Sequence, residues 1–253
     1  MESVIITLIV VVLTFVAGYA GLKVQDWLVE HNSVAQSRDM IGSVLGLLTL
    51  LLALVLGTLI GNTYYFSTAQ QSNLQSMMST LILADKSLAE FGPEAKPVRD
   101  AMKTGLERTY DEVWIKGTLD PDKMTAGATL TGLAPLEKAI DGLDAKTPAQ
   151  TAAKAAAQGK FQAFLGTRLL MALQLAVPFS KALLGIVIIW AALLFFGYGL
   201  LSKHNATTLV ALGFGSICVG FAVFIIVELG EPYSGLFRIS PAALTQAIDA
   251  MDR

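Results

Sequence analysis

Four long apolar stretches divide the chain, and none has a charged residue in its central part. They cover residues 3–23, 40–62, 182–202 and 205–227. A helix rises about 1.5 Å per residue, so about 20 apolar residues cross a hydrocarbon core of about 30 Å. The pattern therefore predicts four transmembrane helices.

The first stretch has two interpretations, a retained helix or a cleaved signal peptide. A signal peptide begins with a basic segment and has an apolar core of about 7–15 residues. Here Met1-Glu2 comes first, and residues 3–22 carry no charge. An acidic residue precedes the apolar run, and the run is too long for the core of a signal peptide. We therefore expect a retained helix.

Between the second and third stretches the pattern changes to one typical of amphipathic helices outside a membrane. Apolar residues recur at three- and four-residue intervals over residues 74–91, and again over residues 98–114. Gly92-Pro93 is expected to end the first of these helices, and Gly117 the second.

The second half of this insert predicts a loop over residues 118–132 and a short helix over residues 133–143. Thr147-Pro148-Ala149-Gln150 then predicts a helix start. The threonine can cap the free amides, the proline fits the first turn, and the glutamine completes a capping box.

The predicted fold is all-α: a four-helix transmembrane bundle with an extramembrane helical insert between the second and third spans. Residues 1–65 form the first transmembrane hairpin and residues 66–180 the insert. Residues 181–253 form the second hairpin and a C-terminal tail, which ends in a short amphipathic helix carrying Ala243, Ala247 and Met251.

Composition and charge limit the classes of partner and cofactor that we expect for this chain. Apolar residues make up 54% and charged residues 15%, whereas a soluble domain carries roughly 25% charged residues. The bilayer is therefore the expected partner. A net charge of −2 gives no electrostatic case for nucleic acid. One cysteine and two histidines leave no spacing typical of zinc or haem, so no cofactor is expected.

The spans also lack the residues that several activities need. No Asp, Glu, Lys or Arg lies within the central part of any span, whereas proton-coupled transporters keep ionisable groups at that depth. The chain has no phosphate-binding glycine loop, nucleophile elbow or paired-carboxylate spacing. We therefore expect a membrane protein that is not an enzyme.

The second span carries small residues at helical spacing and an amide at its end: Gly42, Gly46, Ala53, Gly57, Gly61 and Asn62. Small residues four apart let helix backbones approach closely. One interpretation is a helix that lines or gates an oligomeric pore, and the other is ordinary helix packing. Thr49 and Thr58 would contact a pore or bond to carbonyls of their own helix.

The ends of the spans carry the remaining titratable groups. His31 and His204 lie in the two short loops, either as a pH sensor or as solvated loop residues. Glu228 and Glu231 follow the fourth span, either as a carboxylate ring in an oligomer or as surface anchors.

An even number of spans places both termini and the insert on one side of the membrane. Lys and Arg near the span ends are balanced between the two sides. Glu2 before the first span and Lys23 after it favour an N-terminus outside the cell.

The sequence resembles the bestrophin-like domain family of bacterial integral membrane proteins. The resemblance covers nearly the whole chain and is most specific at the C-terminal end, where the fourth span is followed by Glu228, Pro232, Gly235, Arg238 and Ser240. It also rests on Ser37-Arg38-Asp39, Leu52-Ala53-Leu54-Val55-Leu56-Gly57, Phe91-Gly92-Pro93-Glu94-Ala95, Arg99 and Asn205-Ala206-Thr207. Gly230 departs from the family, which often has an aspartate there.

The resemblance implies a bacterial inner-membrane protein related to anion channels that assemble as pentamers, with second helices around the pore and termini in the cytosol. That topology conflicts with the outside N-terminus inferred from the charges. The leading hypothesis is a homo-oligomeric channel for an inorganic anion. The alternative is a non-conducting membrane scaffold or sensor whose helical insert binds a partner.

Overall fold

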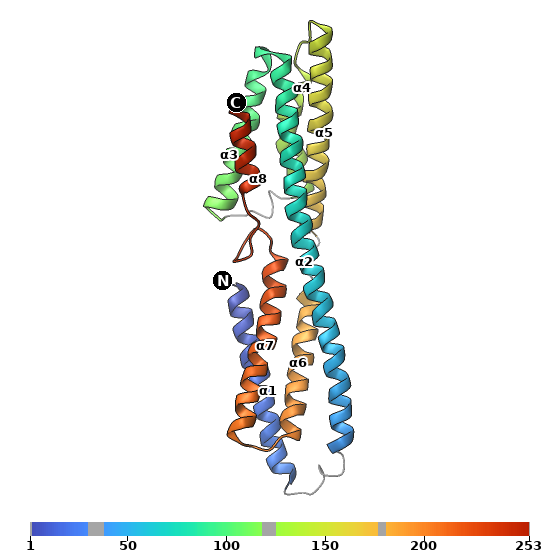
Figure 1. Ribbon diagram of the computed structural model, residues 1–253, viewed down its shortest axis with the longest axis vertical. Helices are drawn as coiled ribbons and strands as arrows, with labels where there is room; N and C mark the ends of the chain where they lie inside the picture. Colours follow the sequence, from blue (N-terminus) through green and yellow to red (C-terminus); the bar gives the residue numbers. More distant parts are fainter. Residues whose placement is uncertain (1, 30–37, 118–124, 177–180, 253) are drawn as a thin grey trace. The chain divides into compact units, whose positions relative to one another are not determined.

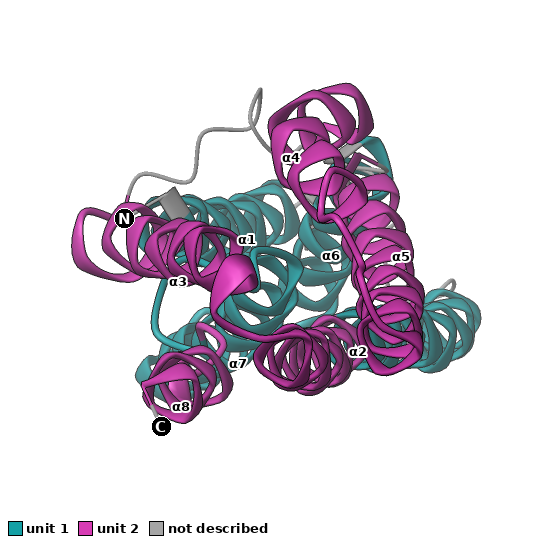
Figure 2. Ribbon diagram, turned by 90° about the horizontal axis from the view of Figure 1, so that it is seen from above, with its two compact units in different colours: residues 1–66, 179–237 teal, residues 67–178, 238–253 magenta. Residues whose placement is uncertain are grey.

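The computed structural model describes residues 2–29, 38–117, 125–176 and 181–252, and within these ranges the secondary structure is helical without strands (Figure 1). The predicted all-α class is therefore confirmed. His31 lies outside the described residues. The chain divides into two compact units, coloured separately in Figure 2, and each is described by itself.

The first unit comprises Met1–Phe66 and Phe179–Phe237. It contains α1 (Glu2–Val29), the first part of α2 (Arg38–Phe91), α6 (Lys181–Leu201) and α7 (Ala206–Gly230). All four helices are long and apolar enough to cross a membrane. The four predicted spans are thus confirmed as helices, although α1 and α2 continue beyond the predicted ends at residues 23 and 62.

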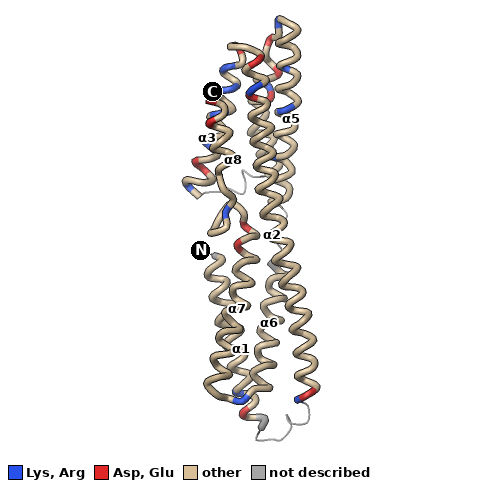
Figure 3. The backbone as a smooth tube through the Cα atoms, viewed as in Figure 1, with Lys and Arg blue, Asp and Glu red and all other residues tan. Residues whose placement is uncertain are grey.

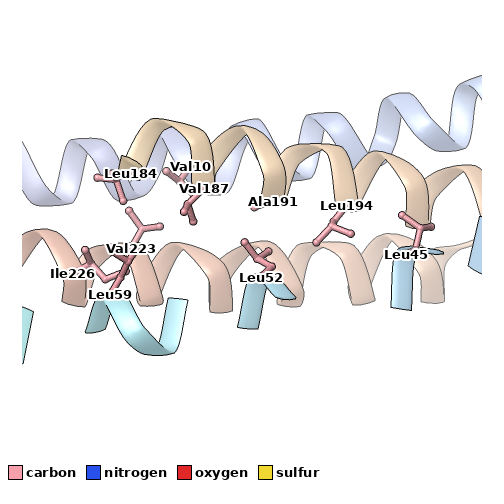
Figure 4. Close-up of a cluster of buried hydrophobic side chains, with 10 residues drawn as sticks. All are labelled: Val10, Leu45, Leu52, Leu59, Leu184, Val187, Ala191, Leu194, Val223 and Ile226. Carbon is pink, nitrogen blue, oxygen red and sulfur yellow. The ribbon is translucent and has the colours of Figure 1, made fainter. Parts of the chain in front are cut away.

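The core of this unit is a cluster of aliphatic side chains from four helices (Figure 4). Helix α2 contributes Leu45, Leu52 and Leu59. The spacing of seven residues keeps these side chains on one face, because two helical turns cover about seven residues. The other members are Val10, Leu184, Val187, Ala191, Leu194, Val223 and Ile226.

Charged residues are confined to the ends of the helices in the first unit (Figure 3). At one end, Arg38 Nη2 donates to the Leu201 carbonyl at 2.7 Å. The Tyr19 ring lies edge-on to His204 at 6.1 Å between centroids, and Lys23 Nζ lies 5.8 Å from the same tyrosine ring. These contacts bring the helix ends that flank the two short loops to the same end of the unit.

The second unit comprises Ser67–Pro178 and Arg238–Arg253. It contains the rest of α2, the short turn η1 (Pro93–Ala95), α3 (Lys96–Tyr110), a π-helical turn η2 (Asp111–Ile115), α4 (Ala126–Asp141), α5 (Pro148–Ala176) and α8 (Ala242–Met251). The predicted apolar stripe of α2 is confirmed, since its members are all buried: Leu74, Met77, Met78, Leu81, Leu88 and Phe91.

The C-terminal tail divides between the units at Phe237. From Arg238 onward it packs with the insert, where α8 contacts α3. Trp114 Nε1 donates to the Ile239 carbonyl at 2.9 Å, and Leu244, Ala247 and Met251 are buried. The last helix is therefore part of the extramembrane core rather than of the transmembrane bundle.

Two predicted helix boundaries are confirmed. Helix α2 ends at Phe91 because Gly92 takes φ 122°, a value that favours glycine. Helix α5 begins at Pro148, where the Gln150 amide donates to Thr147 Oγ1 at 3.1 Å. The glutamine side chain reaches back to the Lys146 amide at 2.9 Å, one residue before the predicted partner.

The loop predicted over residues 118–132 is wrong from Ala126 onward, because α4 begins there. Thr125 caps the helix by accepting from the Ala128 amide at 3.2 Å. Gly127, Gly132 and an internal Pro135 are all accommodated within α4, although glycine and proline weaken an isolated helix. Packing of α4 on α5 supplies the missing stability.

Candidate functional site

From Gly46 to Asn62, the small residues of the second span lie on a face of α2 that the other described residues leave open. Gly46, Ala53, Gly57, Gly61 and Asn62 are exposed. A Cβ atom added at Gly46, Gly57 or Gly61 would meet nothing within 4 Å in the described part of the chain. We call Gly42, Gly46, Ala53, Gly57 and Gly61 the small face of α2.

Gly42, at the start of the small face, is half-buried, and an added Cβ atom there would lie 3.8 Å from the Leu201 side chain. The face that carries Leu45, Leu52 and Leu59 packs into the unit instead. Helix α2 therefore buries one face against its own chain and presents small residues on another.

The threonine hydroxyl groups at positions 49 and 58 of α2 bond to carbonyl groups of their own helix. Thr49 Oγ1 donates to the Leu45 carbonyl at 2.8 Å, and Thr58 Oγ1 to the Val55 carbonyl at 2.9 Å. Thr49 Oγ1 also lies 2.7 Å from the Tyr198 hydroxyl of α6. The interpretation that these threonines bond to their own helix is confirmed, and it matches the usual behaviour of hydroxyl side chains in helices.

Close backbone packing within the chain occurs at other glycines, which the sequence analysis did not single out. A Cβ atom on Gly21 of α1 would overlap the Phe196 carbonyl oxygen of α6, and one on Gly199 would overlap the Gly18 carbonyl oxygen. The signal was present in the sequence as Gly18-Tyr19-Ala20-Gly21 and Gly197-Tyr198-Gly199. These glycines hold α1 against α6.

The residues that follow the fourth span form a turn closed by Glu228. This side chain is 4% exposed, and its carboxylate accepts from the Leu236 amide. Gly235 takes φ 77°, and a Cβ atom on it would overlap the same carboxylate. Pro232 and Tyr233 are buried. In this chain, Glu228 is thus a buried structural group of the turn rather than a solvated surface anchor.

The two remaining residues of the C-terminal motif lie in the second unit. Arg238 is exposed. Ser240 Oγ accepts from the Ala242 amide at 3.3 Å and so lies at the start of α8. The motif therefore contains two structural elements, the Glu228 turn in one unit and the entry to α8 in the other.

Arg99, which follows the Phe91–Ala95 segment, forms a bidentate ion pair within the second unit. Arg99 Nε lies 2.7 Å from Asp85 Oδ1, and Nη2 lies 2.9 Å from Oδ2. The Asp85 side chain is 7% exposed and that of Arg99 is 28% exposed. The hydrogen bonds to Asp85 raise the pKa of Arg99. The pair joins α3 to α2.

Within the described ranges, no group of three or more His, Cys, Asp or Glu residues could hold a metal ion. The one cysteine, Cys218, is exposed on α7.

Comparisons with known proteins agree with this architecture. A family model described as bestrophin-like domain matches residues 10–244. The fold is similar to the crystal structure of a mutant bacterial bestrophin homologue from Klebsiella pneumoniae, with a TM-score of 0.67, 12% sequence identity and coverage of 97% of each chain. No curated protein sequence matches this chain. Because the family model spans most of its length, the chain belongs to the bestrophin-like domain family of membrane proteins.

Proposed function

We propose that this protein is a homo-oligomeric channel for inorganic anions rather than an enzyme, with copies of α2 around the conduction path. The observation that carries the proposal is the small face of α2, which no other described part of the chain covers from Gly46 to Gly61. Small residues at helical spacing let backbones of neighbouring helices approach closely. A second copy of the chain is the partner that would use this face.

The uncharged composition of α2 is compatible with a conduction path that has no charged selectivity filter. Residues 40–62 carry no charge, and the threonine hydroxyls at 49 and 58 already bond to helix carbonyls. Apolar constrictions gate by dewetting, which needs no ionisable side chain at the narrow point. Family membership and the fold of the Klebsiella pneumoniae bestrophin homologue support the channel class.

The alternative is a non-conducting membrane scaffold or sensor whose extramembrane unit binds a partner. It is favoured by a groove between α3 and α4 that is lined mostly by apolar residues. The two proposals differ in stoichiometry, because a pore needs a ring of several subunits, whereas a scaffold does not.

Halide flux from liposomes that contain the purified protein tests the channel proposal. We expect flux above that of empty liposomes, and we expect Gly57→Leu to lower it by about tenfold or more, since a leucine would fill the path beside the helix axis. Gly185→Leu on α6 is the matched control, because a Cβ atom at Gly185 also meets nothing within 4 Å.

Absence of flux from well-folded protein over a range of pH and salt would count against conduction. If Gly57→Leu and Gly185→Leu lowered the halide flux equally, α2 would not line the conduction path. The mass of the particle in nanodiscs completes the test, since a monomer or dimer would favour the scaffold.

We also propose that the N-terminus lies outside the cell and the short loops in the cytoplasm. Because the basic residues near the span ends are balanced between the two sides, the orientation rests on Glu2 before the first span and Lys23 after it, since lysine and arginine favour the cytoplasmic side. Alkaline phosphatase fused to the C-terminus should be active, whereas fused after Lys203 it should be inactive. The reverse pattern would contradict this orientation.

A further inference from the structure

The turn that follows α7 carries two large apolar side chains that are exposed. Leu236 is 77% exposed and Phe237 is 53% exposed. Within α7 itself, the exposed large apolar side chains end at Phe221, and none of residues 222–230 is exposed. Exposed apolar surface in this part of the chain therefore resumes in the turn.

The conformation of the turn brings Leu236 back to the last helical turn of α7. The carboxylate of the buried Glu228 accepts from the Leu236 amide. Gly235 permits this return because it takes φ 77°, a value at which other residues are strained. Since Glu228 belongs to a helix that is long and apolar enough to cross a membrane, the exposed pair lies beside the end of that span.

Helix α2 gives a second marker of the same level. Leu59 of α2 and Ile226 of α7 lie at the same end of the core cluster (Figure 4). Just beyond Leu59, Tyr64 and Tyr65 are both exposed. Tyrosine is enriched where a span leaves the hydrocarbon core, because its ring is apolar and its hydroxyl group reaches the polar region. The level of Leu236 and Phe237 therefore corresponds to a membrane interface.

The charges beside the pair distinguish lipid from a protein partner. Glu231 is exposed in the same turn, and its Oε2 accepts from Ser234 Oγ at 2.9 Å. Arg238 follows the pair and is also exposed. Charged residues are depleted at the centre of protein interfaces, whereas this pair has one acid and one base close to it in the sequence. Apolar side chains flanked by charged ones suit the interface of a bilayer, where both environments are available.

We propose that Leu236 and Phe237 form a lipid anchor. The two side chains insert between the head groups and the acyl chains on the side of the membrane where α2 and α7 end, and the Glu228 turn fixes their depth. Apolar side chains of interfacial segments reach about 5–10 Å into this boundary. The exposed apolar surface of the spans continues into the pair, so phospholipid is the occupant rather than a second copy of the chain. The proposal does not depend on conduction.

The collision accessibility of a spin label tests the depth of the pair. Full-length protein with Cys218→Ala and Phe237→Cys is labelled with a nitroxide in zwitterionic nanodiscs. Relaxation is measured with oxygen, which concentrates in the bilayer, and with a neutral nickel chelate, which stays in water. We expect the oxygen-to-nickel ratio at position 237 to lie between two references. The deep reference is labelled Cys218, exposed on α7, and the aqueous reference is Lys146→Cys with Cys218→Ala.

Substitutions in the turn separate its role from the affinity of the label for lipid. Glu228→Ala removes the acceptor of the Leu236 amide and should raise the nickel accessibility at position 237 by about tenfold, since a hydrogen bond to a charged group is lost. Gly235→Ala strains the same turn without removing the carboxylate and should act in the same direction. Glu228→Gln is the matched control, because its amide oxygen is still an acceptor and should keep the label near the parent depth.

Three outcomes would overturn the proposal. A nickel accessibility at position 237 equal to that of the aqueous reference would place the pair in water. Low accessibility to both oxygen and the nickel chelate would show that protein covers the pair, from a second copy or from the extramembrane unit. An unchanged depth in folded Glu228→Ala and Gly235→Ala protein would show that the turn does not set it.

Discussion

Gly199→Ala is expected to destabilise the transmembrane unit by about 3 kcal/mol, although it adds a single methyl group. The new Cβ atom would overlap the Gly18 carbonyl oxygen on α1. A backbone atom cannot rotate away as a flexible side chain can, so α1 and α6 must separate along their contact. Overpacking of this kind costs about 1–3 kcal/mol in general, and occasionally more. Denaturant unfolding in mixed micelles, followed by tryptophan fluorescence, measures the change.

Gly185→Ala on the same helix is the control for this measurement. Its Cβ atom meets nothing within 4 Å, so the substitution should leave the free energy of unfolding unchanged or raise it by up to about 1 kcal/mol through helix propensity. Similar unfolding energies for the two variants would contradict the close crossing of α1 and α6.

Arg99→Ala is expected to lower the free energy of unfolding of the extramembrane unit by about 3 kcal/mol. The Asp85 side chain is 7% exposed, and the substitution would leave its carboxylate buried without its guanidinium partner. Removing one member of a buried ion pair costs about 3–5 kcal/mol, and the partial exposure of Arg99 places this pair at the lower end. Hydrogen exchange of α3 and of the adjoining part of α2 measures the effect.

Two further variants complete the comparison, namely Asp85→Ala and the double variant that combines it with Arg99→Ala. Because the double variant removes both charges, it should be less destabilised than the sum of the two single variants. Lys103→Ala is a further control, since Lys103 pairs with Asp252 and Glu107 at more exposed positions and exposed pairs of this kind contribute little to stability. Additive single effects would show that Arg99 and Asp85 are not coupled.

The sequence predicted the elements whose signals are local. The four spans follow from runs of apolar residues that lack charge, and the buried stripe of α2 from Leu74 to Phe91 follows from its spacing. The end of α2 at Gly92 and the start of α5 at Pro148 follow from residues that fix backbone conformation or cap amides. Such signals act within one turn of helix, so they survive without knowledge of neighbours.

The prediction failed where a neighbour decides the outcome. The sequence of residues 126–132, which contains Gly127 and Gly132, predicts a loop. These residues are nevertheless helical, because α4 packs against α5. Glu228 was expected either on the surface or in a ring between subunits. Instead it closes a turn with the Leu236 amide, because Gly235 lets the backbone fold back on it.

The glycines show the same difference between what the sequence predicts and what neighbouring helices decide. Sequence spacing selected Gly42, Gly46, Gly57 and Gly61, but close packing within the chain uses Gly18, Gly21 and Gly199. Both sets consist of small residues at intervals compatible with helix contact, so spacing does not distinguish them. Only the positions of the partner helices show that the chain itself fills the first contact, whereas the described residues leave Gly46, Gly57 and Gly61 open.

The sequence by itself determined that this chain is a membrane protein with four apolar helices and a helical insert, because hydrophobic length and period are properties of a single segment. Tertiary structure decided which face of α2 is covered, where the last helix packs, and that α3 and α4 enclose a groove beside Arg168. Those features depend on contacts between residues far apart in the chain. Such contacts produce no periodic pattern in the sequence of either segment.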